Sequence, residues 1–374
     1  IVIGPFTPGY VADQSLAPVS VITRADIERS QAQSVQELLR GSAGVAVANN
    51  GGDGKISAVF LRGSNSGHVL VLVDGIKHGS ATSGTTAFEH IPVDQIERIE
   101  VVRGPRSSLY GSEAIGGVIQ IFTRKGGGKL TPSFSATGGS YDTGKVTAGL
   151  SGGGDHAWFN VNASGASTEG FNSCDGIGAP VFRGCFTTEP DDDGYRSASG
   201  NVRGGYRFNN GAEIDAHWLR AEGKNFFDGF FNESESVQQV IGGSARFSPA
   251  KIWTVTLLGG RSNDDLDSFN NGAFLSQFDT ERDSISLQND FTLAPRHVIT
   301  LGADYQEDRI DVITFAPVPV TSRDNKALFA QYQAGLGKHD FEFSGRGDDN
   351  EQFGTHATGS AAWGYNITGG LRAI

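Results

Sequence analysis

The chain contains no methionine, only two cysteines, and fewer lysines and arginines (30) than aspartates and glutamates (42), for a net charge of −12. It also has no apolar run of the about 20 residues that a membrane-spanning helix requires, which excludes such a helix. Nucleic-acid binding needs clustered cations against phosphates, so the charge balance argues against a nucleic-acid partner.

The missing methionine extends to the first position, and no charged-then-apolar leader follows. We therefore expect a mature chain from which a signal peptide has been removed. Cys174 and Cys185 lie in one polar loop. A local disulfide formed in an oxidising compartment is the preferred interpretation, and two free thiols in a reducing compartment are the alternative. Zinc would need further ligands nearby, and the sequence offers none.

What the chain has in abundance is glycine (53 residues) and phenylalanine (24 residues), which suits tight turns and aromatic girdles. From about residue 130 the pattern has a period of two, as in the alternation of Phe159 and Val161 with Asn160 and Asn162. Several polar residues of this pattern would be costly in a dry protein core without partners. An apolar exterior around a polar interior is typical of an outer-membrane barrel.

The connections between these strands alternate in length. Short turns are separated by longer polar loops, at about residues 168–194, 222–234, 262–280 and 306–324. Outer-membrane barrels have short periplasmic turns and long extracellular loops. We predict a mainly β protein in which residues 127–374 form a transmembrane antiparallel barrel of about thirteen strands, each of about 10 membrane-crossing residues.

The first part, residues 1–126, has the pattern of a small mixed α/β domain. Thr23 with Asp26 predicts a capped helix, and Ser34 predicts the start of a second one. Val69–Val73 is apolar throughout and predicts a strand that is buried on both faces. Three glycines from Gly126 onward predict a hinge to the barrel.

Three segments of this domain carry a resemblance to a known family. They are residues 59–63 (Val-Phe-Leu-Arg-Gly), residues 69–75 (Val-Leu-Val-Leu-Val-Asp-Gly) and residues 99–117, which contain Arg-Gly-Pro-Arg and end in Gly-Gly. They resemble the plug of the TonB-dependent outer-membrane receptors, and the whole chain resembles the cobalamin transporters of that family. The resemblance implies an α/β plug inside a barrel of about 22 strands, of which this chain would supply the N-terminal part.

The resemblance also implies a location and partners. We expect a monomer in the bacterial outer membrane, surrounded by lipid bilayer and lipopolysaccharide. It would import cobalamin with energy delivered by TonB and its inner-membrane energising complex. Ile1, Val2 and Ile3 resemble the start of the segment that pairs with TonB. Pro5 departs from the family pattern, and because proline cannot donate to a strand ladder, pairing should stop there.

Further site residues follow from the same resemblance. Two plug loops would touch the ligand, because small polar residues let the backbone approach a large polar molecule. The expected ligand-binding residues are Asn49, Asn50, Ser57 and Thr82. Arginines beside glycines would pair with barrel glutamates and so fix the plug, and the expected residues are Arg62, Arg103 and Arg106.

An acidic loop predicts calcium as a loop-ordering ion. Asp191 and Asp193 match the family's Asp-x-Asp-Gly pattern, while Glu222 and Asn172 stand where the family has aspartates, and Asp228 lies in the next loop. Calcium takes six to eight oxygen ligands in flexible geometry. The alternative is a solvated acidic loop.

Three other functions remain open from the residues alone. Phe226, Phe227, Phe230 and Phe231 would suit a receptor for a ferric siderophore or another metal chelate. A surface adhesin, or a phage or bacteriocin receptor without transport, is a different class. An enzyme is the third, but the sequence has no H-E-x-x-H and no G-x-S-x-G motif, so we expect no catalysis.

Overall fold

The computed structural model describes residues 16–173, 180, 189–315, 317–368 and 371–374. The expected TonB segment, Ile1 to Ile3, and the expected disulfide between Cys174 and Cys185 lie outside the described residues. They stay predictions.

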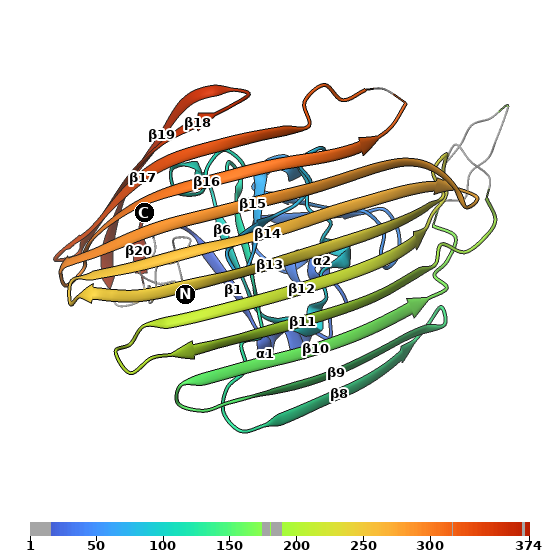
Figure 1. The fold of residues 1–374 in the computed structure, drawn as a ribbon, viewed down its shortest axis with the longest axis horizontal. Coiled ribbons are helices and arrows are strands. Elements are labelled where there is room, and N and C mark those ends of the chain that lie inside the picture. Colours follow the sequence, from blue (N-terminus) through green and yellow to red (C-terminus); the bar gives the residue numbers. More distant parts are fainter. Residues whose placement is uncertain (1–15, 174–179, 181–188, 316, 369–370) are drawn as a thin grey trace.

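The N-terminal part forms a plug with one five-stranded sheet, in the order β1-β6-β7-β4-β5, and a separate hairpin β2-β3. In Figure 1 this plug lies behind the long strands of a second, larger sheet. The plug elements are β1 (Val19–Thr23), α1 (Arg24–Ser30), α2 (Val35–Arg40), β2 (Val45–Asn49), β3 (Ser57–Leu61), β4 (Val69–Val73), β5 (Ile76–His78), β6 (Ile96–Arg103), α3 (Ser107–Tyr110) and β7 (Gly117–Thr123), with short 3-10 turns at Ser66–His68, Phe88–His90 and Val93–Gln95.

Local capping explains where the first two helices begin. Thr23 accepts a hydrogen bond from the backbone N–H of Asp26, and the Asp26 carboxylate accepts one from the Thr23 N–H at 3.0 Å, which completes the predicted capping box. Ser34 caps α2 through the N–H of Glu37. Such caps satisfy backbone donors that a helix leaves unpaired, and each stabilises its helix by about 1 kcal/mol.

Strand β4 is buried along its whole length, as its continuous apolar sequence predicts. Val71 and its neighbours of the same parity pack with the helices α1 and α2 in one apolar cluster. Leu70 and Leu72 face the other way, into a second cluster that contains Leu109 of α3 and Phe329 of the large sheet. The plug therefore has a core on each face of its sheet, and barrel residues complete both: Leu219, Val240 and Leu258 on the first side and Phe329 on the second.

The large sheet has thirteen antiparallel strands in sequence order, from β8 to β20, and confirms the predicted barrel architecture. Strand β7 of the plug ends at Thr123 and β8 begins at Thr131, so the expected boundary at residue 126 falls between them. The strands are β8 (Thr131–Gly139), β9 (Thr143–Gly153), β10 (Ala157–Thr168), β11 (Tyr195–Arg207), β12 (Glu213–Phe226), β13 (Glu233–Ala250), β14 (Trp253–Asn270), β15 (Ala273–Ala294), β16 (His297–Ile313), β17 (Ser322–Leu336), β18 (His339–Asn350), β19 (Gly354–Thr368) and β20 (Leu371–Ala373).

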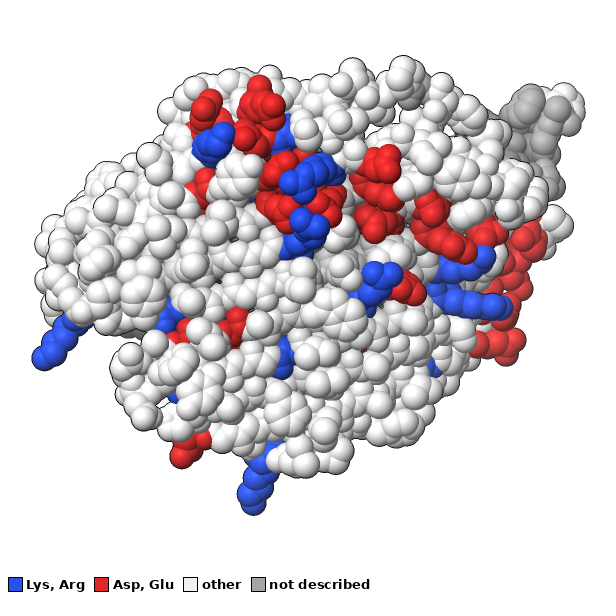
Figure 2. Space-filling view, viewed as in Figure 1, with Lys and Arg blue, Asp and Glu red and all other residues white. Residues whose placement is uncertain are grey.

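The two faces of this sheet have opposite character. Phe159 and Val161 are exposed on the outside, whereas Asn160 is only 1% exposed on the inside. In Figure 2 charged residues gather toward one end of the outer face, and the rest of that face carries few. Ion pairs such as Arg261 with Asp283, at 2.7 Å, belong to this charged region. An apolar outer band with a polar interior is the pattern of a lipid-embedded barrel.

One part of the loop prediction is wrong. The sequence predicts a long loop at residues 262–280, but β14 continues to Asn270 and β15 begins at Ala273. The turn between them is Asn271-Gly272, with φ values of 49° and 75°. Positive φ at both residues is the signature of a tight hairpin turn. The strands extend beyond the apolar band, where both faces are polar and alternation disappears. The expected loops 222–234 and 306–324 are present but shorter, at residues 227–232 and 314–321, because the flanking strands extend into them.

Within the described residues, no helix is long and apolar enough to cross a membrane.

Candidate functional site

The two ends of the barrel sheet differ. At the end that we call the loop end lie the connections from β10 to β11, β12 to β13 and β16 to β17, and at the turn end lie short turns such as residues 154–156. The β2-β3 connection of the plug, residues 50–56, which we call the apex loop, reaches the loop end. There Lys55 Nζ donates to the backbone oxygen of Asp193 at 2.9 Å and to Asn225 Oδ1 at 2.7 Å.

The predicted ligand-binding residues have different surroundings. Asn49 Nδ2 donates to Ser57 Oγ at 2.9 Å, and its Oδ1 accepts from the N–H of Gly51 at 2.9 Å, so this pair shapes the apex loop from within. Asn50 lines a cavity beside the loop. Thr82 is exposed on the second plug loop, where its hydroxyl lies 2.8 Å from Ser80 Oγ.

This cavity, which we call the apex cavity, has a volume of ≈ 570 Å³ and lies between the plug and strands β12 to β14. Polar and aromatic side chains share its wall, among them Lys55, Glu89, Phe227, Asp228, Phe231 and Gln238. Within the described residues, Glu89 Oε2, Asp228 Oδ2 and Gln238 Oε1 are buried acceptor atoms with no hydrogen-bond partner. Buried acceptors without donors are costly. These three oxygens are closed to solvent, so N–H or O–H groups of a ligand in the cavity would reach them after a rotation of the side chains.

Two acids of this cavity have raised pKa values. Burial raises the pKa of Glu89 to about 8. The pKa of Asp228 is raised to about 6, first by burial and then by the negative charges of Asp193, Glu189 and Asp191. The acidic loop residues thus lie close enough to Asp228 to repel its charge.

The structure brings only part of the predicted calcium set together. Glu222 lies on the outer face of β12, paired with Arg220 at 2.7 Å. The Asp193 carboxylate accepts from the Ser173 N–H at 2.7 Å, and Asn172 Nδ2 donates to the Glu189 backbone oxygen at 2.8 Å. In the described part of the chain, no three acidic, histidine or cysteine side chains converge as a metal site requires. The calcium site stays a prediction.

Among the three predicted locking arginines, the structure brings one to a barrel carboxylate. Arg106 Nη1 lies 3.0 Å from Glu342 Oε1 of β18, and both side chains are nearly buried. Arg103 instead donates to the backbone oxygen of Ala43 at 2.8 Å, within the plug. Arg62 is exposed, with a positive φ of 51°.

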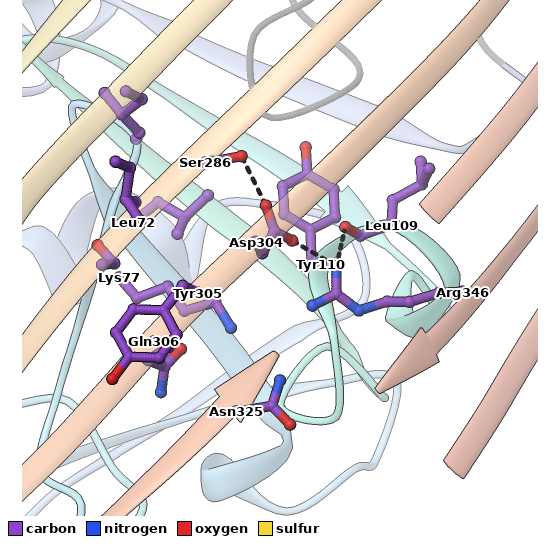
Figure 3. A pocket seen from close by; sticks show the side chains of 14 residues that line it. Leu72, Lys77, Leu109, Tyr110, Ser286, Asp304, Tyr305, Gln306, Asn325 and Arg346 are labelled. Atoms are coloured by element: carbon purple, nitrogen blue, oxygen red, sulfur yellow. Dashed lines mark hydrogen bonds and ion pairs between the residues drawn. The ribbon is translucent and has the colours of Figure 1, made fainter. Parts of the chain in front are cut away.

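Other ion pairs between plug and barrel use cations of the barrel, two of them arginines, which the sequence interpretation missed. Arg203 lies 2.6 Å from Asp74 of the plug, and Arg282 lies 3.0 Å from Glu113. Arg346 donates to the Leu109 backbone oxygen at 3.1 Å and also pairs with Asp304, as Figure 3 shows. The alternation of inward and outward positions along each strand could have revealed these arginines. They occupy inward-facing positions, where a charge needs a partner.

The comparisons with known proteins agree with this geometry. Residues 12–118 match the family described as TonB-dependent Receptor Plug Domain. Together with the barrel sheet that packs around this plug, the match shows that the N-terminal part of the chain is a plug domain of the TonB-dependent receptor type.

More specific similarity comes from curated relatives. The chain is 32% identical to the vitamin B12 transporter BtuB of Photobacterium profundum, over 96% of this chain and 58% of that protein. It is also 32% identical to BtuB of Vibrio vulnificus, over 93% of this chain and 56% of that protein. The chain thus spans less than two thirds of the length of these relatives.

Solved structures share the fold at lower identity. A ferric enterobactin receptor (PfeA) mutant from Pseudomonas aeruginosa superposes with a TM-score of 0.78 at 18% identity, covering 94% of this chain and 60% of that one. The siderophore receptor PirA from Acinetobacter baumannii gives a TM-score of 0.77, also at 18% identity, covering 96% of this chain and 60% of that one.

The pair of Arg106 and Glu342 yields a first prediction. Arg106→Met leaves a buried carboxylate without its cation, so we expect the plug to lose about 3–5 kcal/mol of stability. The double variant Arg106→Met/Glu342→Met should recover most of this loss, because an apolar pair can replace a buried ion pair. Native-state hydrogen exchange of the α3 amides measures the loss in the single variant and the recovery in the double variant. Arg62→Met is the exposed control and should change little; equal losses in single and double variants would contradict the pairing.

A second prediction concerns pH. The carboxyl of Asp228 has its pKa raised from 3.8 to about 6, so the ordered loop binds this proton more tightly than the unfolded loop. Lowering the pH from about 7.5 to about 5.5 should therefore stabilise residues 226–233 and slow their amide exchange beyond the intrinsic effect. In the Asp228→Asn variant, amide exchange of residues 226–233 should already be slow at the higher pH and should not slow further when the pH is lowered. Glu222→Gln, on the outer face, should behave like the unmodified protein. A pH response that persists in Asp228→Asn would rule this origin out.

Proposed function

We propose that this chain forms the plug and part of the barrel of an active transport receptor that imports cobalamin across the outer membrane. Its support is the identity of 32% to vitamin B12 transporters over at least 93% of the chain. The plug filling the barrel interior fits a gated importer rather than an open pore. The proposal includes no covalent step.

The apex cavity is the structural observation that carries the ligand assignment. Cobalamin bears primary carboxamides around its ring, and these groups offer N–H donors. Glu89, Asp228 and Gln238 line this cavity beside the aromatic rings of Phe227 and Phe231, and each has one buried oxygen without a hydrogen-bond partner among the described residues. Donors from the ligand would remove the desolvation cost of those acceptors. Asn50 and Thr82 lie on the adjacent plug loops as further contacts.

Energy coupling is the second part of the proposal. TonB, driven by its inner-membrane complex, would pair with Ile1, Val2 and Ile3 and pull on the plug. Pulling shifts the plug between conformational states, and this supplies transport without a chemical reaction at the ligand. We propose that the receptor acts as a monomer within lipid bilayer and lipopolysaccharide, which suits the exposed apolar band of the barrel.

Calcium is a separate proposal. The negative charges of Asp193 and Asp191 contribute to the raised pKa of Asp228, and this clustering of negative charge supports a cation in this region. Since the described arrangement does not close around a metal, no step of transport is assigned to it.

A ferric siderophore or another metal chelate is the second candidate ligand. Phe227 and Phe231 line the apex cavity, and aromatic walls suit catecholate-type chelates. The structural neighbours named as siderophore receptors support the fold alone at their 18% identity. An adhesin or a phage or bacteriocin receptor without transport has no comparable support from the site.

Ligand binding provides the third prediction. Cyanocobalamin should bind tightly to the purified receptor in detergent with calcium, and more weakly with EGTA. Isothermal titration calorimetry measures both conditions. Tight binding that EGTA does not change would support cobalamin as the ligand and would refute the calcium site. Asp191 and Asp193 would then belong to an ordinary solvated loop. Absence of binding in both conditions, with binding of a ferric siderophore instead, would move the ligand to the metal chelates.

The fourth prediction tests coupling. Deletion of residues 1–5 should leave cyanocobalamin binding unchanged and abolish its uptake into cells, because the segment is proposed to contact TonB and not the ligand. Uptake of radiolabelled cyanocobalamin, with binding measured on the same cells, separates the two steps. Uptake at the normal rate would refute the role of this segment.

A further inference from the structure

Lys55 joins the plug to the loop end of the barrel through contacts that no sequence motif predicted. Its Nζ donates to Asn225 Oδ1 at 2.7 Å, to the Asp193 backbone oxygen at 2.9 Å and to the Gly194 backbone oxygen at 3.3 Å. The residue is only 2% exposed. These acceptors lie just before β11 and at the end of β12, so one plug side chain holds two barrel strands.

The surrounding backbone is fitted closely to this contact. A Cβ atom at Gly54 would lie 2.1 Å from Cδ2 of Tyr195, so the apex loop packs directly on that ring. The Tyr195 hydroxyl lies 2.9 Å from Nδ1 of His90, another plug residue. The Asp193 carboxylate in turn accepts from the Ser173 N–H at 2.7 Å. The apex loop and residues 193–195 are therefore held together through Lys55.

The ammonium of Lys55 has neutral partners. Among the described residues, it forms no ion pair with a carboxylate, and its acceptors are carbonyl and amide oxygens. Burial lowers the pKa of Lys55 to about 8, although Asp193 and Asp53 act in the opposite direction. In the present hydrogen bonds only the donor carries a full charge, whereas an anionic acceptor would add the Coulomb attraction between two unit charges. An anionic group that reached this ammonium would thus be a better partner than those it has.

Lys55 also lines the apex cavity, so a ligand there would lie beside this side chain. We propose that Lys55 binds the anionic group of the incoming ligand and, in doing so, releases the backbone oxygens of Asp193 and Gly194. This inference rests on the proposed function, because in cobalamin the only anionic group outside the ring is its phosphodiester. Binding of the phosphate would then loosen the contact between plug and loop end before TonB pulls.

The experiment compares two probes that differ by the phosphate, cobinamide phosphate and cobinamide. We expect the unmodified receptor to prefer cobinamide phosphate by roughly 10- to 100-fold in Kd, as one hydrogen bond to a charged group allows. Lys55→Met and Lys55→Gln should bring the ratio close to one, and Lys55→Arg should largely restore it. Lys224→Met is the matched control, since Lys224 precedes Asn225 but pairs with Glu233 and Glu235 on the outer face. It should keep the full ratio.

The outcomes separate this inference from the proposed function. If neither probe nor cyanocobalamin binds the unmodified receptor, the cobalamin assignment fails. If cyanocobalamin binds but the two probes bind equally, or if Lys55→Gln keeps the preference, only the role of Lys55 is overturned. Amide exchange gives the readout for release: residues 193–195 should exchange faster with cobinamide phosphate than with cobinamide. Equal exchange with both probes would refute the release step.

Discussion

The structure depends on one constraint: the inner face of the barrel wall is polar, so whatever fills it must supply partners for buried charge. A charged group taken out of water without a partner is strongly unfavourable. The plug meets this demand with Asp74 and Glu113 against barrel arginines, and with Arg106 against Glu342. Apolar contacts of the plug with Leu219, Val240, Leu258 and Phe329 of the wall complete the interface on both faces of the plug sheet. Plug and wall are each incomplete without the other.

The outer face of the barrel has the opposite character, because it faces lipid instead of the plug. Lipid accepts apolar side chains, so Phe159, Val161 and Leu287 are exposed there without forming a protein core. Toward the loop end the strands continue past this band and carry ion pairs such as Arg309 with Glu281, at 2.7 Å. The change from apolar to charged along one strand marks where lipid chains end and polar surroundings begin.

How much the sequence could predict follows from this division. The capped helix after Thr23 and the buried strand Val69–Val73 rest on local rules, and both are present. The alternating barrel strands rest on lipid outside and polar groups inside. The strand segments beyond the band, such as residues 262–270, lack that contrast and therefore resemble loop in sequence. Pairings between distant residues, such as Arg203 with Asp74, depend on three-dimensional register, which no local pattern encodes.

The candidate site shows the same limit. Family resemblance directs attention to Asn49 and Ser57, but these two residues hydrogen-bond each other and shape the apex loop. Lys55, two positions earlier than Ser57, has no distinguishing motif, yet it makes the contacts that reach the barrel. Its importance comes from where β11 and β12 place their ends.

The polar wall has a mechanical consequence. When a domain with an apolar interface is pulled away, apolar surface becomes exposed to water. The free-energy cost of this exposure grows with the area exposed. Here the wall facing the plug carries Gln288, Thr300, Gln331 and Arg346, which water solvates readily. If parts of the plug were displaced, the wall exposed behind them would be polar at these positions and readily hydrated. Under the proposed transport, water could replace the plug against these polar residues at a lower cost than against the apolar residues Leu219, Val240, Leu258 and Phe329.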